Sequence, residues 1–319
     1  MAKVKAWKFA DSSQPDFPDD FEIAQKAVLQ VTDIKSNHNK YYAVELHQAD
    51  ENGSTLYRVF THYGRTDDLD RNPESGQKEC RYYDSLGEAQ AGYHSIYNQK
   101  TAPRKGYKEV SLAASNIGSQ KARGTSSGEV DEKTLAKIEE AEKEKAGKKK
   151  KEPPKTLDLH AKIRSLVEYV FAEATNALTT TVNAKITANG IETPLGILTI
   201  GQIEKGEDIL DEAYALFNKK RARNRADRLE QLTGEFYTLI PHRIGRTRAA
   251  IADSVIDSLE KFGEKQETLQ LMKDMLQVAG EGEENVLFNQ QIDQQYLSLK
   301  CHLDYVEKKS DEFKEIEAY

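Results

Sequence analysis

Long apolar runs and cysteines are scarce in this sequence of 319 residues, and their scarcity excludes several classes of protein. No stretch of about 18 apolar residues occurs, so we expect no transmembrane helix and no membrane partner. The opening stretch "MAKVKAWKFADSSQ" has no apolar segment and does not resemble a secretory signal. Cys80 and Cys301 lie far apart, which fits a reducing compartment and gives neither a disulfide framework nor a zinc signature. Both thiols are expected to be inert.

Motifs for catalysis are also absent from the sequence. It has no glycine-rich phosphate loop and no nucleophile elbow. His242, in "TLIPHRIG", has no second histidine, cysteine or acid at metal-ligand spacing, and it follows Pro241. We therefore expect His242 to be a hydrogen-bonded structural residue in a turn. We predict no catalytic residue, no metal site and no bound cofactor in this chain.

The charge balance is acidic, with a formal net charge of −7. Such a chain binds nucleic acid only through a local basic patch. Lys148–Lys151 lies beside prolines and is a candidate nuclear-import signal, a solvated linker or a nucleic-acid tether. The densest basic segment is Asn218–Arg228, which can end a helix with favourable cations, contact phosphates or serve as a second import signal.

The first half of the sequence predicts a small antiparallel sheet with one helix. Residues 1–21 are polar and are expected to form a tail. Residues 22–115 contain short runs rich in β-branched and aromatic residues, and Asn52-Gly53 between two of them is a hairpin signal. Ser85 with Glu88 predicts a capping box at the start of the helix.

The second half is predicted to be an all-α bundle, so the fold class is α+β with several domains. Residues 116–156 are rich in Gly, Ser and charge and predict a flexible linker, whose middle can form a solvated helix. Residues 157–281 carry apolar side chains at helical spacing, as in a multi-helix domain. Residues 282–319 are expected to begin with a strand and then a helix.

Residues 22–115 resemble the WGR domain of poly(ADP-ribose) polymerases. The resemblance rests on "VTDIKSNHNKYYAVELH" and "SGQKECRYYDSLGEAQAGYHSIYNQKT", with the signature tripeptide between them. The family has Trp-Gly-Arg at this position, predicted to be a turn, and this chain has Tyr63-Gly64-Arg65.

Later segments of the chain are similar to other domains of the same family. "ETPLGILTIGQIEKGEDIL" and "LTGEFYTLIPHRIG" resemble motifs of its regulatory, autoinhibitory helical domain, and "ADSVIDSLEKF" fits the next helix. Residues 282–319 are similar to the start of its ADP-ribosyltransferase domain, and no position matches that domain's nicotinamide pocket. The resemblance therefore implies a regulatory portion of an NAD+-using enzyme, with NAD+ as the substrate of the full enzyme and the transferase domain as a partner in cis.

The resemblance also implies a role in the nucleus, where the WGR-like domain holds DNA strand breaks and so relieves a block that the helical domain places on NAD+ access. The implied DNA-binding residues combine a stacking ring, a close-packed backbone and cations for phosphate: Tyr63, Gly64, Arg65, Lys100, Arg104 and Lys105. Three alternatives stay open at this point. Arg65 can simply pair with Asp67 or Asp68, the chain can be a non-catalytic DNA-binding adaptor, and the protein can be purely structural.

Overall fold

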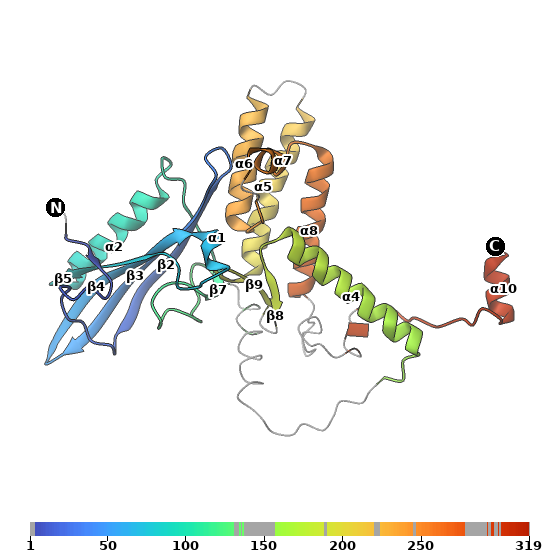
Figure 1. Cartoon of the computed structure of the whole chain (residues 1–319), viewed down its shortest axis with the longest axis horizontal. Helices are drawn as coiled ribbons and strands as arrows, with labels where there is room; N and C mark the ends of the chain where they lie inside the picture. Colours follow the sequence, from blue (N-terminus) through green and yellow to red (C-terminus); the bar gives the residue numbers. More distant parts are fainter. Residues whose placement is uncertain are drawn as a thin grey trace.

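A computed structural model describes the protein at residues 4–130, 134, 136, 157–187, 190–219, 224–244, 247–277, 292, 295–296, 299 and 301–318. It confirms the α+β fold class: an antiparallel sheet with one covering helix is followed by a region of helices (Figure 1). Lys148–Lys151 lies outside the described residues. Among the residues described, no helix is both long and apolar enough to cross a membrane.

The large sheet has six antiparallel strands in the order β1-β5-β4-β3-β2-β6. Their bounds are Trp7–Lys8 for β1, Glu22–Asp33 for β2, His38–Glu51 for β3, Ser54–Arg65 for β4, Gln77–Tyr83 for β5 and Lys108–Glu109 for β6. The β3–β4 hairpin turns at Asn52 and Gly53, both with φ > 0, as the sequence predicts.

Helix α2 (Leu86–Thr101) covers one face of this sheet, and the Ser85 side chain accepts a hydrogen bond from the Glu88 amide at its start. Alternate residues of the strands point toward α2 and pack with it. This packed cluster consists of Ala27, Leu29, Tyr42, Val44, Leu46, Val59, Ala89 and Tyr93.

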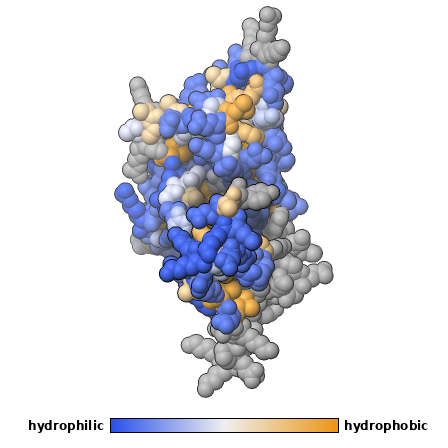
Figure 2. All heavy atoms as spheres, turned by 90° about the vertical axis from the view of Figure 1, so that its right-hand side faces the viewer, coloured by the Kyte–Doolittle hydropathy of each residue, from blue (hydrophilic) through white to orange (hydrophobic). Residues whose placement is uncertain are grey.

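The helical region begins with α4 and is built around α5, α6 and α8, which stand side by side in Figure 1. The bounds are Ala161–Thr181 for α4, Ile200–Asn218 for α5, Arg225–Leu239 for α6, Arg248–Asp253 for α7, Leu259–Gln277 for α8 and Asp311–Glu317 for α10. Figure 2 views the molecule from the α10 side and shows a mostly hydrophilic surface with separate hydrophobic patches.

A second, smaller sheet joins the two parts and was not predicted. Its order is β7-β10-β9-β8, with β7 at Leu112–Ser115, β8 at Lys185–Thr187, β9 at Gly190–Thr193 and β10 at Gly196–Leu198. Because β7 comes from the first half of the chain and the other strands from the second, this sheet is shared. A buried core also runs across the junction, from Val28 and Tyr41 of the large sheet to Ile203 and Phe236 of the helices.

The structure differs from the sequence-based expectation at both ends of the first domain. Within the predicted tail, Trp7–Lys8 forms strand β1, and the Phe9 ring packs edge-on against Phe60. Within the predicted linker, Ile117 and Ala122 are fully buried. Both segments cover the sheet face opposite α2, where they bury polar side chains such as Glu45 and His62 as well as the Phe60 ring.

The last segment also differs from the expected strand. Ile292 and Tyr296 have helical conformation, and they pack against Ile163 and Val167 of α4. The predicted helix is present as α10. Several of the neighbouring positions lie outside the described residues.

Candidate nucleic-acid interface

The tripeptide Tyr63-Gly64-Arg65 ends strand β4, and the prediction that it forms a turn was wrong. Pairing with β3 continues to the last residue, where Arg65 lies opposite Lys40. Extended backbone sends successive side chains to opposite faces of the sheet. Tyr63 therefore packs on the α2 face, whereas Gly64 faces the other side.

Gly64 is required for close packing and not for a bend. Its φ is not among the positive values in the chain. A Cβ atom at this position would lie 3.1 Å from Gly76 Cα and 3.2 Å from the Tyr41 ring. The predicted turn at Gly64 is thus absent, and the glycine instead lets the loop after α1 (Thr66–Leu69) lie against the strand.

Tyr63 stacks on Tyr42 of the neighbouring strand, with ring centroids 5.1 Å apart and an interplanar angle of 11°. Its hydroxyl lies 2.9 Å from Gln77 Oε1 and 2.8 Å from Glu79 Oε1. Burial and the bond to Glu79 raise the pKa of Tyr63 to about 12. One ring face is occupied, so a base or sugar can stack only on the opposite face.

Lys100, at the end of α2, is held by aromatic rings. Its Nζ lies 3.9 Å from the ring centroid of Tyr42, 5.7 Å from that of Tyr63 and 5.6 Å from that of Tyr107. Burial, and next the neighbouring charge of Lys105, lowers the pKa of Lys100. These cation–π contacts stabilise the Tyr42–Tyr63 stack and place the positive charge of Lys100 over its rings.

Arg65 forms the ion pair that the alternative interpretation predicts. Its Nη2 lies 3.2 Å from Asp67 Oδ2, and Nη1 lies 3.5 Å from the Asn37 carbonyl. The Arg65 side chain is nevertheless 38% exposed. A phosphate could therefore reach it only in competition with Asp67.

The structure adds residues that sequence reasoning missed. Lys40 lies opposite Arg65 in the sheet. The positive charges of Lys40 and Arg81 both contribute to lowering the pKa of Lys100. The hairpin signal at Asn52-Gly53 could have predicted that Lys40 and Tyr42 lie opposite Arg65 and Tyr63. Once Glu51 pairs with Ser54 at the Asn52-Gly53 turn, every later pair in the hairpin is fixed.

The remaining predicted residues, Arg104 and Lys105, are exposed in the loop after α2. This loop lines one wall of a groove of about 640 Å³, and acidic residues of α6 line the other wall. Ion pairs cross between the walls: Lys35 Nζ lies 4.0 Å from Asp227 Oδ1, and Lys108 Nζ lies 3.9 Å from Glu235 Oε2. The basic loop thus faces the helical region.

A line of hydrogen bonds leads from Arg65 to α6. Asn39 Nδ2 donates to Asp67 Oδ1 at 2.8 Å, and Thr32 Oγ1 lies 3.5 Å from Asn39 Oδ1. The Thr32 amide then donates to Thr238 Oγ1 in α6 at 2.8 Å. The arginine of the signature tripeptide is therefore connected to the helical region through three side chains.

Two other basic or polar candidates have structural roles. Asn218 ends α5, as one reading of the basic segment predicts, and Arg228 pairs with Glu212 at 2.8 Å. His242 is buried, with Nδ1 2.7 Å from the Ile240 carbonyl, and burial lowers its pKa to about 3. Its prediction as a hydrogen-bonded residue is confirmed. Over the part of the chain described, no group of three His, Cys, Asp or Glu residues is placed to hold a metal.

Comparison with protein families gives two matches in chain order. The model for the WGR domain matches residues 25–113, and the model described as "Poly(ADP-ribose) polymerase, regulatory domain" matches residues 158–296. The first match includes every predicted DNA-binding residue. The second includes α4 to α8.

Several known proteins are similar to this chain over about nine tenths of its length. Poly [ADP-ribose] polymerase 2-A of Oryza sativa subsp. japonica is 26% identical, over 92% of this chain and 40% of its own length. Protein mono-ADP-ribosyltransferase PARP3 of Gallus gallus is 28% identical, over 91% of this chain and 51% of its own. Poly [ADP-ribose] polymerase 2 of Homo sapiens is 26% identical, over 92% and 46%. The chain thus spans about half the length of the relatives it matches.

Proposed function

Because this chain carries a WGR domain followed by the regulatory domain of poly(ADP-ribose) polymerases, we propose that it is the DNA-break-sensing and regulatory portion of such an enzyme. The observation that carries the proposal is the gathering of Tyr63, Arg65 and Lys100 at one end of the sheet, with Lys105 close by. Stacking rings beside cations suit a strand end with a terminal phosphate.

We propose that Arg65 binds the phosphate and that Tyr63 offers the ring face opposite Tyr42 to the adjacent sugar or base. Arg104 and Lys105 extend the positive surface along the DNA backbone. Phosphate contacts of this kind supply affinity that falls with salt, because bound counterions are released. The overall acidic charge of the chain then restricts binding to this patch.

The regulatory part of the proposal is a coupling between this surface and the helices. The helical domain would restrain a transferase domain in cis, with NAD+ as the substrate of that domain. DNA at Arg65 would draw it away from Asp67 and disturb the hydrogen bonds through Asn39 and Thr32 to Thr238. Such coupling requires only that binding at one site changes the stability of the other. We place this activity in the nucleus, where broken DNA occurs.

A binding titration tests the proposal, using 5′-phosphorylated nicked duplex and intact duplex of equal length. We expect the nicked duplex to bind more tightly, and Arg65→Ala to weaken binding and lower the salt slope by about 1. Lys162→Ala removes the same unit of charge from the exposed start of α4 and should leave binding unchanged. Equal binding by wild type and Arg65→Ala would rule out the proposed phosphate contact.

The adaptor alternative shares the DNA contact and differs in what the helices do. Hydrogen exchange of the helices, measured with and without nicked DNA in a chain that includes a transferase domain, separates the two. Faster exchange with DNA supports regulation, whereas unchanged exchange favours an adaptor.

A further inference from the structure

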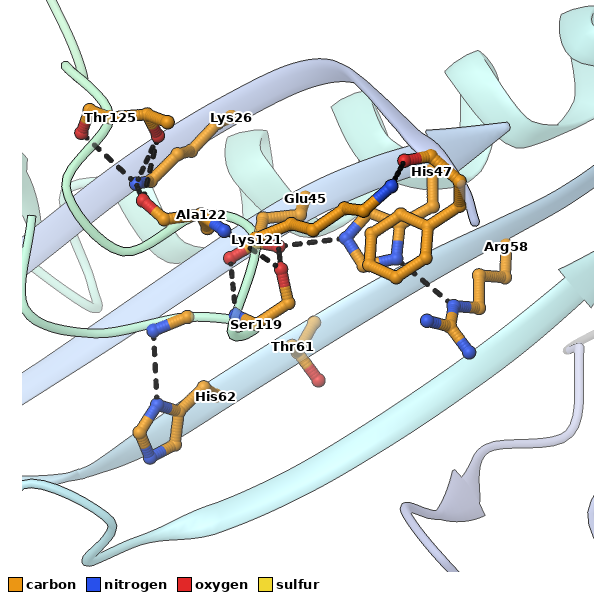
Figure 3. Close-up of polar contacts among 12 residues, drawn as sticks. Lys26, Glu45, His47, Arg58, Thr61, His62, Ser119, Lys121, Ala122 and Thr125 are labelled. Carbon is orange, nitrogen blue, oxygen red and sulfur yellow. Dashed lines mark hydrogen bonds and ion pairs between the residues drawn. The ribbon is translucent and has the colours of Figure 1, made fainter. Parts of the chain in front are cut away.

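Residues 116–127, here called the strap, follow β7 and cross the face of the large sheet opposite α2 (Figure 3). At its start the strap is attached to the small sheet: the Asn116 amide donates to the Leu195 carbonyl at 2.8 Å, and Asn116 Nδ2 lies 2.8 Å from Glu192 Oε1. The strap therefore touches both parts of the molecule.

A buried carboxylate, Glu45 of β3, holds the middle of the strap. Glu45 is fully buried and accepts a bond from the Ser119 amide at 3.0 Å and from Ser119 Oγ at 2.6 Å. Burial alone would raise the pKa of Glu45, but these bonds and His47 outweigh it and leave the pKa below its usual value. Glu45 is thus charged, and both of its carboxylate oxygens accept hydrogen bonds from the strap.

His47 and Arg58 fix the orientation of Glu45. Arg58 Nε can only donate, so the His47 Nδ1 atom 3.0 Å away accepts, and the ring proton lies on Nε2. His47 Nε2 then donates to Glu45 Oε2 at 2.7 Å. Two donors, Ser119 Oγ and His47 Nε2, therefore converge on one carboxylate oxygen.

The backbone conformation and hydrogen bonds of the strap also fit it to the sheet surface around Glu45. Gly118 has a φ of +107°, which favours glycine, and a Cβ atom there would collide with Glu45 Oε1. The Gly118 amide donates to His62 Nδ1 at 3.2 Å. Farther along, Lys26 Nζ donates to the Ala122 carbonyl at 2.6 Å, and burial lowers the pKa of Lys26 to about 8.

The preceding residues are bonded into the helical region. The Ser111 amide donates to Gln202 Oε1 in α5 at 3.0 Å, and Gln202 Nε2 donates to the Leu239 carbonyl at the end of α6 at 3.2 Å. Strand β7 lies between this point and the strap, and it pairs with β10. Displacing the strap would pull directly on the strand next to β10.

We propose that the strap is a conformational clamp: its seating on Glu45 stabilises the β7–β10 pair and the start of α5, and its release loosens the helical region. Glu45 and Ser119 are positioning residues in this device. The inference rests on the proposed function only in taking the helical region to be regulatory. Its route is separate from the line of bonds that starts at Arg65.

Hydrogen exchange on this chain without DNA tests the clamp. Glu45→Gln keeps the size of the side chain but replaces one acceptor oxygen with an NH2 donor. In one orientation this NH2 group faces the Nε2 proton of His47 and the Ser119 hydroxyl, and in the other it faces the Ser119 amide. We expect exchange of β10 and the first turn of α5 to rise roughly tenfold or more, because a buried donor loses its partner. Glu51→Gln, at the exposed end of the same strand, is the matched control and should change nothing.

Ser119→Ala removes the hydroxyl that donates to Glu45 and accepts from the Ala122 amide, but it keeps the carboxylate and the Ser119 amide bond, so it provides a milder test should Glu45→Gln fold poorly. It should raise exchange in the same segments by a smaller factor, while α2 stays protected. Faster exchange confined to the strap, or β10 unchanged in both variants, would overturn the clamp. Failure of wild type to bind nicked DNA would contradict the proposed function and leave this result intact.

Discussion

At the scale of single residues, the candidate site depends on a competition at Arg65. Its guanidinium is shared between Asp67 and the open surface, with an N–O distance of 3.2 Å in the ion pair. Exposed pairs of this kind contribute about 0–1 kcal/mol, so a DNA phosphate could displace the carboxylate. Asp67 then acts as a restraint on DNA binding as well as a link to Asn39.

We expect Asp67→Asn to raise the affinity for nicked DNA about threefold to tenfold, because it frees Arg65 and removes a negative charge beside the phosphate. Fluorescence anisotropy at several salt concentrations measures this. Asp50→Asn changes the net charge equally but lies at the other end of the β3–β4 hairpin, where it bonds to Thr55. A similar gain from both variants would assign the effect to net charge alone.

Tyr63 and Arg65 could be proposed from the sequence through the family resemblance, because the signature tripeptide is contiguous, and their contact with DNA stays a prediction. The sequence was insufficient for Glu45, His47 and Ser119, since these residues come from a strand and a distant segment and acquire their roles only through burial. The strap is polar and rich in Gly and Ser, and nothing in that sequence indicates that it covers a buried carboxylate.

At the scale of elements, α6 closely contacts the end of β2, beyond the residues of β2 that pair with β6. A Cβ atom at Gly234 would lie 2.7 Å from the Thr32 carbonyl oxygen. One turn later in α6, Thr238 Oγ1 accepts a hydrogen bond from the Thr32 amide. Two residues of the "LTGEFYTLIPHRIG" motif are thus explained by contact with the other domain. This contact also gives a partner to a β2 amide that lies beyond the short pairing with β6.

Gly234→Ala should lower the free energy of unfolding by about 1–3 kcal/mol, since the added methyl must push α6 away from β2. Gly263→Ala is the matched control, because Gly263 lies in α8 with no atom within 4 Å of the added carbon. That variant should be neutral or gain up to about 1 kcal/mol from helix propensity. Thermal unfolding measures both, and a shift of the same sign in both variants would contradict the close-contact argument.

Long helices were predictable from apolar spacing, as α4, α5, α6 and α8 confirm. The strands of the small sheet were not. Each of β8, β9 and β10 has only three or four residues, which is too short for an alternating pattern, and β10 is defined by pairing with a strand far away in the chain.

At the scale of the whole molecule, three buried histidines make stability depend on pH. Burial lowers the pKa of His62 to about 4 and that of His242 to about 3, and it also lowers the pKa of His47. These rings are neutral in the folded protein, while the unfolded chain binds protons near pH 6.5. Protonation therefore favours the unfolded state, and stability is lost as the pH falls below about 6.5.

His62 alone should account for about 2 kcal/mol of stability lost between pH 7 and pH 5. Chemical denaturation at both pH values measures the loss. His62→Gln should be less stable at pH 7 but show a smaller pH dependence, whereas His94→Gln, an exposed change on α2, should retain the wild-type dependence. An undiminished dependence in His62→Gln would show that other groups dominate acid sensitivity.

The shared small sheet has a consequence for dividing the protein into fragments. A cut placed in the polar sequence just after residue 115 would carry β7 away with the first fragment. The second fragment would then present β10 with an unpaired edge, open to strands from other molecules. We therefore expect an isolated helical fragment to self-associate unless residues 111–130 are kept with it, so an oligomer seen in such a fragment would report the missing strand and would say nothing about assembly of the intact protein.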